Sequence, residues 1–258
     1  MDRGTLGVQI GGKHTLKDWN LGWLSITLGF PEAKTYEQEI PGADGIIDLT
    51  EAVTGDVKYK QRSISMEFDQ LDADYFDWQA KLSEIANYLA GQKFKIFLDS
   101  DPAFYYIGRL KLDTEKSEKA ESKITISGEV DPYKYEKYSS LEDWTWDDFN
   151  FETGIIREYK DLQVDGSYQL YIPGRRKKIV PVIECSAAMQ VTYNGKKYSL
   201  PAGKSKVFDI WLGEGDNYLT FVGNGTVSVD YRGGSLYCIE CYVTTKCCTT
   251  SGMKNICF

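Results

Sequence analysis

Short runs of alternating apolar and polar residues, separated by turn residues, recur throughout the second half of the chain. The pair Asn194–Gly195 follows one of these runs, and Asn224–Gly225 separates two others. Asn-Gly is a strong hairpin signal because both residues tolerate positive φ. The runs lie at residues 168–172, 180–185, 189–193, 197–200, 206–210, 217–222 and 226–231. Short strands at such regular spacing predict a β-sandwich or barrel.

The first half, residues 1 to about 135, combines the same strand pattern with a single helix. Ile64, Met66 and Phe68 alternate with polar residues, as in a strand that is buried on one face. A loop with proline and glycine spans residues 41–45. Further strands are predicted at residues 21–30, 94–98, 106–112 and 123–130.

One helix is predicted between these strands. Asp72 or Asp74 can cap its N-terminus, and Gly91 stands where a helix commonly ends. Spacings of four, three and four residues place its large apolar side chains on one face. That stripe consists of Trp78, Leu82, Ile85 and Leu89.

Composition narrows the classes of function. The chain of 258 residues is 42% hydrophobic and 14% aromatic, which supports a packed core. Its net charge of -8 argues against a general nucleic-acid binder, since phosphate binding needs a basic surface. The basic run 175–178 is interpreted as a solvated turn, with a phosphate-binding patch as the weaker alternative.

No segment approaches the roughly 20 apolar residues of a membrane span, so no membrane partner is expected. Residues 1–13 lack the layout of a signal peptide, which indicates synthesis and folding in a cytoplasm.

The chain offers little material for catalysis. His14 is the only histidine, nothing near it resembles a nucleophile elbow, and a surface-loop histidine is the better interpretation. Acidic pairs such as Asp99 with Asp101 are interpreted as solvated loop residues. We therefore expect no enzyme, and we assign no catalytic, cofactor-binding or metal-binding residues.

The last stretch, residues 237–258, breaks the strand pattern. Cys238 and Cys241 have the spacing of half a zinc site, and later cysteines could supply the other two ligands. A single such pair is a weak signal, and disulfides are awkward without an export signal. An extension outside the folded unit is favoured. The five cysteines of this stretch are Cys238, Cys241, Cys247, Cys248 and Cys257.

Taken in order, these features resemble the distal tail protein (Dit) family of long-tailed phages and prophages of Gram-positive bacteria. The resemblance covers roughly residues 15–235. It begins with the segment Asp-Leu-Thr-Glu-Ala-Val-Thr-Gly at residues 48–55, followed by Tyr59, Arg62 and the strand to Phe68. The helix and a closing hairpin follow, ending in Asp-Pro-Tyr-Lys-Tyr at residues 131–135.

The resemblance implies a structural virion protein at the tail tip. Residues 1–135 would form a split β-barrel related to tail-tube proteins, which assembles into a homo-hexameric ring. Residues 136–160 would be an acidic and aromatic linker, and residues 161–236 a galectin-like β-sandwich. The implied partners are the major tail tube protein, a tail-associated tip protein and often a receptor-binding protein. DNA would pass through the lumen without specific binding. The negative net charge of the chain is compatible with this.

Two other functions compete with this hub. A carbohydrate-binding adsorption module would offer exposed aromatic residues beside polar partners, although a lectin-like fold does not establish a lectin. Its candidate residues are Trp211, Tyr193, Tyr198 and Tyr218. Trp211 lies in an alternating run, 207–212, which predicts a core position instead. A tail-tip wall hydrolase is disfavoured by the single histidine and the missing nucleophile.

Overall fold

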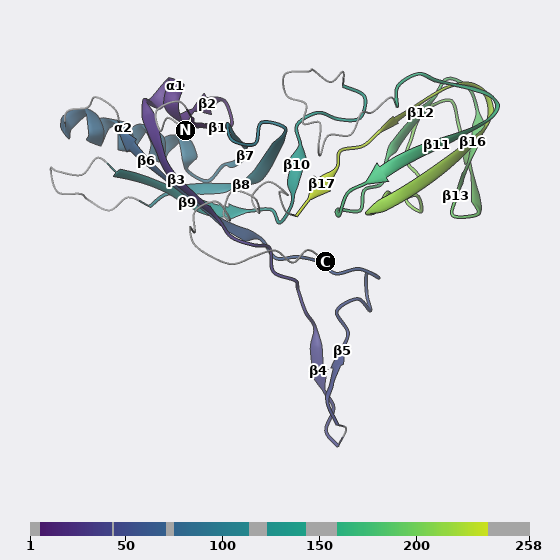
Figure 1. The fold of residues 1–258 in the computed structure, drawn as a ribbon, viewed down its shortest axis with the longest axis horizontal. Coiled ribbons are helices and arrows are strands. Elements are labelled where there is room, and N and C mark those ends of the chain that lie inside the picture. Colours follow the sequence, from purple (N-terminus) through teal and green to yellow (C-terminus); the bar gives the residue numbers. More distant parts are fainter. Residues whose placement is uncertain (1–5, 43, 71–74, 114–122, 143–158, 237–258) are drawn as a thin grey trace, which may run out of the picture.

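The protein is mainly β, as its strand pattern predicted. The computed structural model describes residues 6–42, 44–70, 75–113, 123–142 and 159–236. Two large antiparallel sheets lie beside each other, and a two-stranded hairpin projects away from both (Figure 1). Each sheet has its own hydrophobic core.

The first sheet has nine strands, and most of them come from the first half of the chain. Their order is β2-β1-β7-β8-β9-β6-β3, with β10 beside β8 and β17 beside β10. Ile64, Met66 and Phe68 are buried in its core, which confirms the predicted inward face of β6. The strands are β1 (Val8–Ile10), β2 (Lys13–His14), β3 (Leu21–Leu28), β6 (Arg62–Gln70), β7 (Lys93–Leu98), β8 (Phe104–Leu112), β9 (Lys123–Val130), β10 (Lys134–Glu136) and β17 (Gly234–Ser235).

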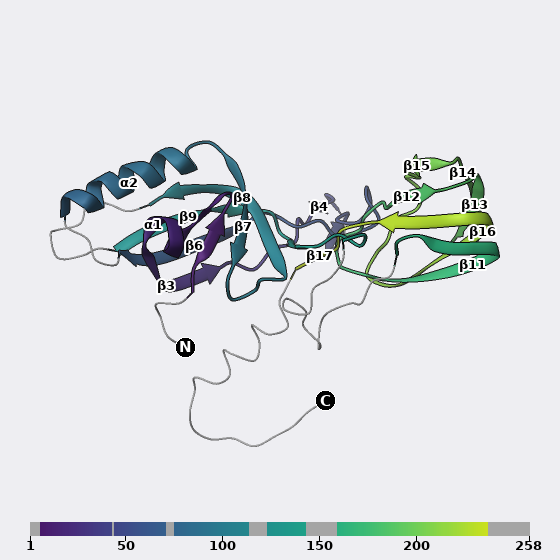
Figure 2. The ribbon, with the colours of Figure 1, turned by 90° about the horizontal axis from the view of Figure 1, so that it is seen from above.

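The long helix α2 (Tyr75–Leu89) lies along one side of the first sheet (Figure 2). Its predicted apolar stripe packs against the core of this sheet, and Gly91 beyond its end has a φ of 68°. Glycine adopts that left-handed conformation without strain, so the predicted helix end is confirmed. The predicted N-terminal cap falls in residues 71–74, outside the described residues. Neither helix of the described ranges is long and apolar enough to cross a bilayer.

A second, five-residue helix, α1 (Thr15–Trp19), was not predicted, so the expectation of a single helix is wrong. The His14 side chain begins it, because its Nδ1 accepts hydrogen bonds from the backbone N–H groups of Leu16 and Lys17, at 3.2 and 3.3 Å. His14 also lies 3.2 Å from a carboxylate oxygen of Asp99. It is thus a largely buried capping residue and not a loop histidine.

Glu84 ties helix α2 to the first elements of the chain. Its Oε1 accepts hydrogen bonds from Lys13 at 2.7 Å and from the indole N–H of Trp19 at 3.1 Å. The bond from Lys13, more than any other contact, lowers the pKa of the Glu84 carboxyl below its usual 4.5.

We expect Glu84→Gln to reduce the acid sensitivity of the fold. A carboxyl with a lowered folded pKa stabilises the protein above its unfolded pKa, and that contribution is lost as pH falls through the folded value. Unfolding in urea should therefore show a smaller loss of stability below pH 4.5 in the variant. The control is Glu142→Gln, which removes an exposed ion pair with Arg232. It should leave the pH dependence of stability nearly unchanged. Identical pH profiles for Glu84→Gln and the unsubstituted chain would contradict the assignment.

The second sheet has six strands in the order β14-β13-β16-β12-β15, with β11 paired along β16. Asn194 and Gly195 both have positive φ and join β13 to β14, so this predicted hairpin is confirmed. The fully buried side chains at its centre include Ile183, Val191 and Phe221. The strands are β11 (Leu162–Gly174), β12 (Val182–Cys185), β13 (Met189–Tyr193), β14 (Lys196–Leu200), β15 (Gly203–Ser205) and β16 (Gly215–Asp230).

Two predictions for the second sheet are wrong. Asn224–Gly225 is not a turn, because β16 continues through it from Gly215 to Asp230. Gly225 has a φ of 138°, and a side chain there would meet the Ser186 hydroxyl at 2.5 Å. Around this point β16 changes one of its partners from β13 to β12. The predicted strand 206–210 is also absent, since residues 206–212 form an irregular segment with one bridge, Ile179 to Leu212.

Candidate assembly surfaces and a candidate ligand pocket

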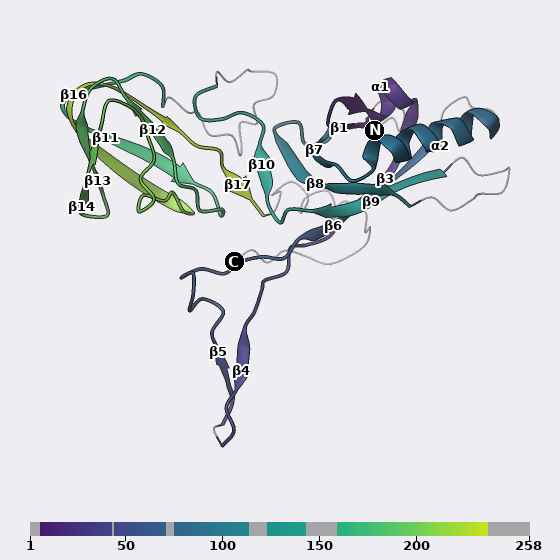
Figure 3. The ribbon, with the colours of Figure 1, turned by 180° about the vertical axis from the view of Figure 1, so that it is seen from behind.

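The projecting hairpin is the most exposed apolar feature of the described chain. It spans residues 30–60, which we call the arm, and its tip is formed by β4 (Glu37–Glu39) and β5 (Ile46–Asp48) (Figures 1 and 3). Near the body, hydrogen bonds between Lys34 and Lys58 and between Lys60 and Glu32 hold its two sides together.

The segment 48–55, on which the family resemblance rests, forms a turn within the arm. Oδ1 of Asp48 accepts a hydrogen bond from the N–H of Thr50 at 2.9 Å, and Thr50 lowers the pKa of the Asp48 carboxyl. The Thr50 hydroxyl in turn accepts from the N–H of Tyr36 at 3.0 Å. These bonds fix the shape of the arm without burying its apolar side chains.

The arm carries large hydrophobic side chains that the described chain does not cover. Val53 is 93% exposed and Ile46 is 56% exposed. Large exposed apolar patches on soluble proteins commonly mark interaction sites. The sequence predicted only a loop at residues 41–45 and no exposed apolar surface. The signal that could have indicated this surface is a set of apolar residues in the arm that follow neither strand nor helix periodicity. The exposed set is Phe30, Tyr36, Ile40, Ile46, Ile47 and Val53.

The basic run 175–178 connects the two sheets and the base of the arm, so its interpretation as a solvated turn is wrong. Nε of Arg175 lies 3.0 Å from the buried carboxylate of Glu136. The Lys177 ammonium donates to the Tyr135 hydroxyl at 3.2 Å, and burial lowers the pKa of Lys177. All four side chains contact other residues. The run therefore has no free cation for a phosphate-binding patch, which disfavours that alternative.

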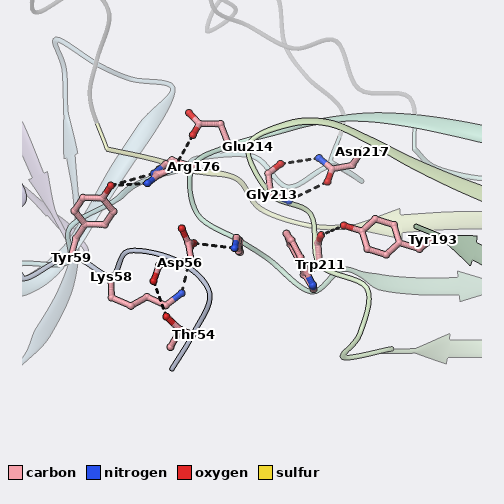
Figure 4. Close-up of polar contacts among 11 residues, drawn as sticks. Thr54, Asp56, Lys58, Tyr59, Arg176, Tyr193, Trp211, Gly213, Glu214 and Asn217 are labelled. Carbon is pink, nitrogen blue, oxygen red and sulfur yellow. Dashed lines mark hydrogen bonds and ion pairs between the residues drawn. The ribbon is translucent and has the colours of Figure 1, made fainter. Parts of the chain in front are cut away.

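The other two members of this run contact the base of the arm (Figure 4). Arg176 donates from Nη2 to the Tyr59 hydroxyl at 2.9 Å and from Nη1 to Glu214 at 3.1 Å. Lys178 lies 3.4 Å from Asp56 and 4.5 Å from the centre of the Trp211 ring. The arm is thus anchored to the second sheet by two cations from one short segment.

A pocket of about 480 Å³ opens on the second sheet beside this junction. Trp211 lines it and is 41% exposed, so its predicted core position is wrong. The irregular backbone of residues 206–212 explains the difference, because it does not alternate as a strand does. Tyr218 also lines the pocket and is exposed on β16.

The remaining two candidate aromatics take other roles. Tyr193 is buried and also lines the pocket, and its hydroxyl donates to the carbonyl of Trp211, which holds that part of the pocket wall in place (Figure 4). Tyr198 lies on β14 and lines an adjoining pocket of about 350 Å³ together with Phe208. The structure therefore brings Trp211, Tyr193 and Tyr218 together and places Tyr198 to one side.

Among the described residues, no three His, Cys, Asp or Glu side chains are arranged to hold a metal ion. Cys185 is buried and is not paired, and burial raises the pKa of its thiol. The Cys-rich stretch and the acidic core of the predicted linker, residues 237–258 and 143–158, lie outside the described residues.

Comparison with known proteins relates part of the chain to a known family of domains. Residues 11–130 match the model of the phage tail protein RIFT-related domain. The matched part contains most of the first sheet, α2 and the arm, and it is similar to that family of phage tail domains. No curated protein matches the chain.

A solved structure extends the similarity of the fold beyond the matched domain. The chain is similar to the Dit protein of phage SPP1, described as a paradigm of the hub adsorption apparatus in phages that infect Gram-positive bacteria. The two share 14% sequence identity, with 88% of this chain and 99% of the other covered at a TM-score of 0.59. The predicted family resemblance is thus confirmed.

Proposed function

We propose that the protein forms a homo-hexameric ring at the distal end of a phage tail, joining the tail tube to the tail tip and the host-recognition apparatus. In this proposal it has no catalytic activity. It is made in the host cytoplasm, and its partners are the major tail tube protein, the tail-associated tip protein and a receptor-binding protein. The family of the first sheet and the shared fold with SPP1 Dit support this placement.

The observation that carries the proposal is the exposed apolar arm. A ring closes through a heterologous contact, in which one surface of each copy binds a different surface of the next. The arm reaches far from its own body and presents uncovered apolar side chains, as such a contact requires (Figure 3). Among the described residues β3 pairs with β6 on one side only, so it is an edge strand of the first sheet and offers a second surface for pairing.

We also propose the division of the chain into residues 1–135, 136–160, 161–236 and 237–258, with a galectin-like second domain. Two separate cores support the main division. In the ring the first domain would surround the lumen, and the net charge of -8 suits passage of DNA without specific binding.

The triple variant Ile46→Ser, Ile47→Ser and Val53→Ser tests the ring. Burying one such side chain contributes about 1.5–3 kcal/mol, so the variant should lose several kcal/mol of contact energy per interface and remain monomeric. Light scattering and negative-stain imaging should show hexamers with a central hole for the unsubstituted chain. The matched control is Phe208→Ser, which removes a residue that is 77% exposed on the second sheet's side.

Either of two results would contradict the ring. In the first, the unsubstituted chain stays monomeric both alone and with the tail tube protein. In the second, the triple variant assembles as readily as the control, which would place the contact outside the arm.

A further inference from the structure

The outward face of the second sheet carries an ordered set of side chains that lies outside the arm proposed for the ring contact. Tyr171 and Tyr218 stand opposite each other on β11 and β16, and their ring centroids are 5.4 Å apart. The next outward row contains Gln169, Thr220 and Thr192 across β11, β16 and β13. An aromatic row therefore lies beside a polar row on one exposed face.

The pocket joins these rows to Trp211. Its walls include the aromatic side chains of Trp211 and Tyr218. They also include the polar Gln169, Thr192 and Thr220 and two acids, Glu214 and Asp216. Its volume of about 480 Å³ lies within the roughly 300–1,000 Å³ of small-ligand sites. This combination of aromatic, uncharged polar and acidic walls on one sheet is suited to a small polar ligand.

The acidic side chains of the pocket are held in place by neighbours. Oδ1 of Asp216 accepts a hydrogen bond from the Tyr171 hydroxyl at 2.9 Å, and this bond, before any other cause, raises the pKa of Tyr171. Glu214 is bound by Arg176 at 3.1 Å, which connects the pocket wall to the junction between the sheets. Carboxylates in such positions accept hydrogen bonds from hydroxyl groups and repel anions.

We propose that this pocket binds a neutral saccharide. A pyranose ring has an apolar C–H face, which packs on an aromatic ring, and an edge of hydroxyl groups, which needs several acceptors and donors. Trp211 and Tyr218 supply the aromatic surface, and Asp216 and Glu214 supply strong acceptors. The two acids disfavour anionic polymers such as glycerol phosphate chains. Saccharide binding at this pocket is independent of ring formation.

The test is binding of purified full-length protein to methyl glycosides of glucose, galactose and N-acetylglucosamine, and to an array of neutral bacterial surface glycans. Saturation-transfer NMR and calorimetry should detect at least one neutral saccharide. Tyr218→Ala and Asp216→Asn should each weaken that binding by about tenfold or more, equivalent to about 1.4 kcal/mol. Tyr36→Ala, which removes an exposed tyrosine from the arm, should leave binding unchanged.

Asp216→Asn keeps the size and shape of the side chain, so its effect separates lost recognition from lost folding. Three outcomes would overturn the proposal: no binding to any neutral glycan, binding that both variants retain, or a preference for glycerol phosphate polymer over every neutral saccharide. Because monomers and rings carry the same pocket, failure of this test leaves the ring proposal unaffected, and the reverse also holds.

Discussion

Replacement of Glu136 by alanine is expected to lower the free energy of unfolding by about 3 kcal/mol. The Glu136 side chain is only 7% exposed, and it binds two groups from distant parts of the chain. One carboxylate oxygen accepts from Nε of Arg175, and the other accepts from the backbone N–H of Gly233, each at 3.0 Å. Removing the carboxylate leaves a partly buried cation and a buried N–H without these bonds, and such losses cost more than the bonds contribute.

The loss of stability can be measured by urea unfolding, from the midpoint and the slope of the transition. The control is Glu142→Ala, because Glu142 pairs with Arg232 at 3.5 Å and is 50% exposed. Exposed pairs contribute about 0–1 kcal/mol, so the control should change stability little. Equal losses in the two variants would show that burial does not determine the effect, contrary to the argument.

The position of Glu136 gives this prediction a functional meaning. It lies on β10, which pairs with β8 of the first sheet and with β17, the strand that follows the second sheet in sequence. Loss of its contacts should loosen the junction of the two sheets and leave the arm intact. The variant is therefore expected to form rings in which the second sheet is less well ordered in averaged images.

The regular elements of the fold were predictable because their patterns are local. Alternation over Ile64, Met66 and Phe68 reports one buried face directly, and the helical stripe ending at Leu89 does the same. Asn194–Gly195 also acts locally, since its two positive φ values make the turn whatever surrounds it.

The features that define the candidate sites depend on contacts between distant residues, and local patterns do not report them. The basic run 175–178 has the composition of a solvated turn, yet its partners Tyr59, Asp56 and Glu136 lie far from it in sequence. The apolar residues of the run 207–212 alternate in the sequence, but the backbone there is irregular, so the alternation does not report a buried strand face. Asn224–Gly225 contains a turn dipeptide, but tertiary pairing with β11 keeps β16 extended through it.

Replacement of Asn217 by alanine is expected to lower the free energy of unfolding by about 3 kcal/mol and to disrupt the pocket. Asn217 is buried at the start of β16, and its Nδ2 donates to the carbonyls of Ile172, Gly213 and Gly215 at 2.8–3.2 Å. Its Oδ1 accepts from the N–H of Gly213 at 3.2 Å (Figure 4). One side chain thus satisfies four backbone groups that water does not reach easily.

The matched control is Asn224→Ala, since the Asn224 side chain accepts a single exposed hydrogen bond, from the N–H of Gly166 at 3.1 Å. It should lose less than about 1 kcal/mol. Asn217 also sets the path of the turn at Gly213–Gly215, because a side chain at Gly174 would meet the Gly213 carbonyl at 1.7 Å and the two backbones must approach closely there. That turn carries Glu214 on the pocket wall. Asn217→Ala should therefore weaken saccharide binding in protein that is still folded, whereas Asn224→Ala should not, and equal effects would refute a positioning role for Asn217.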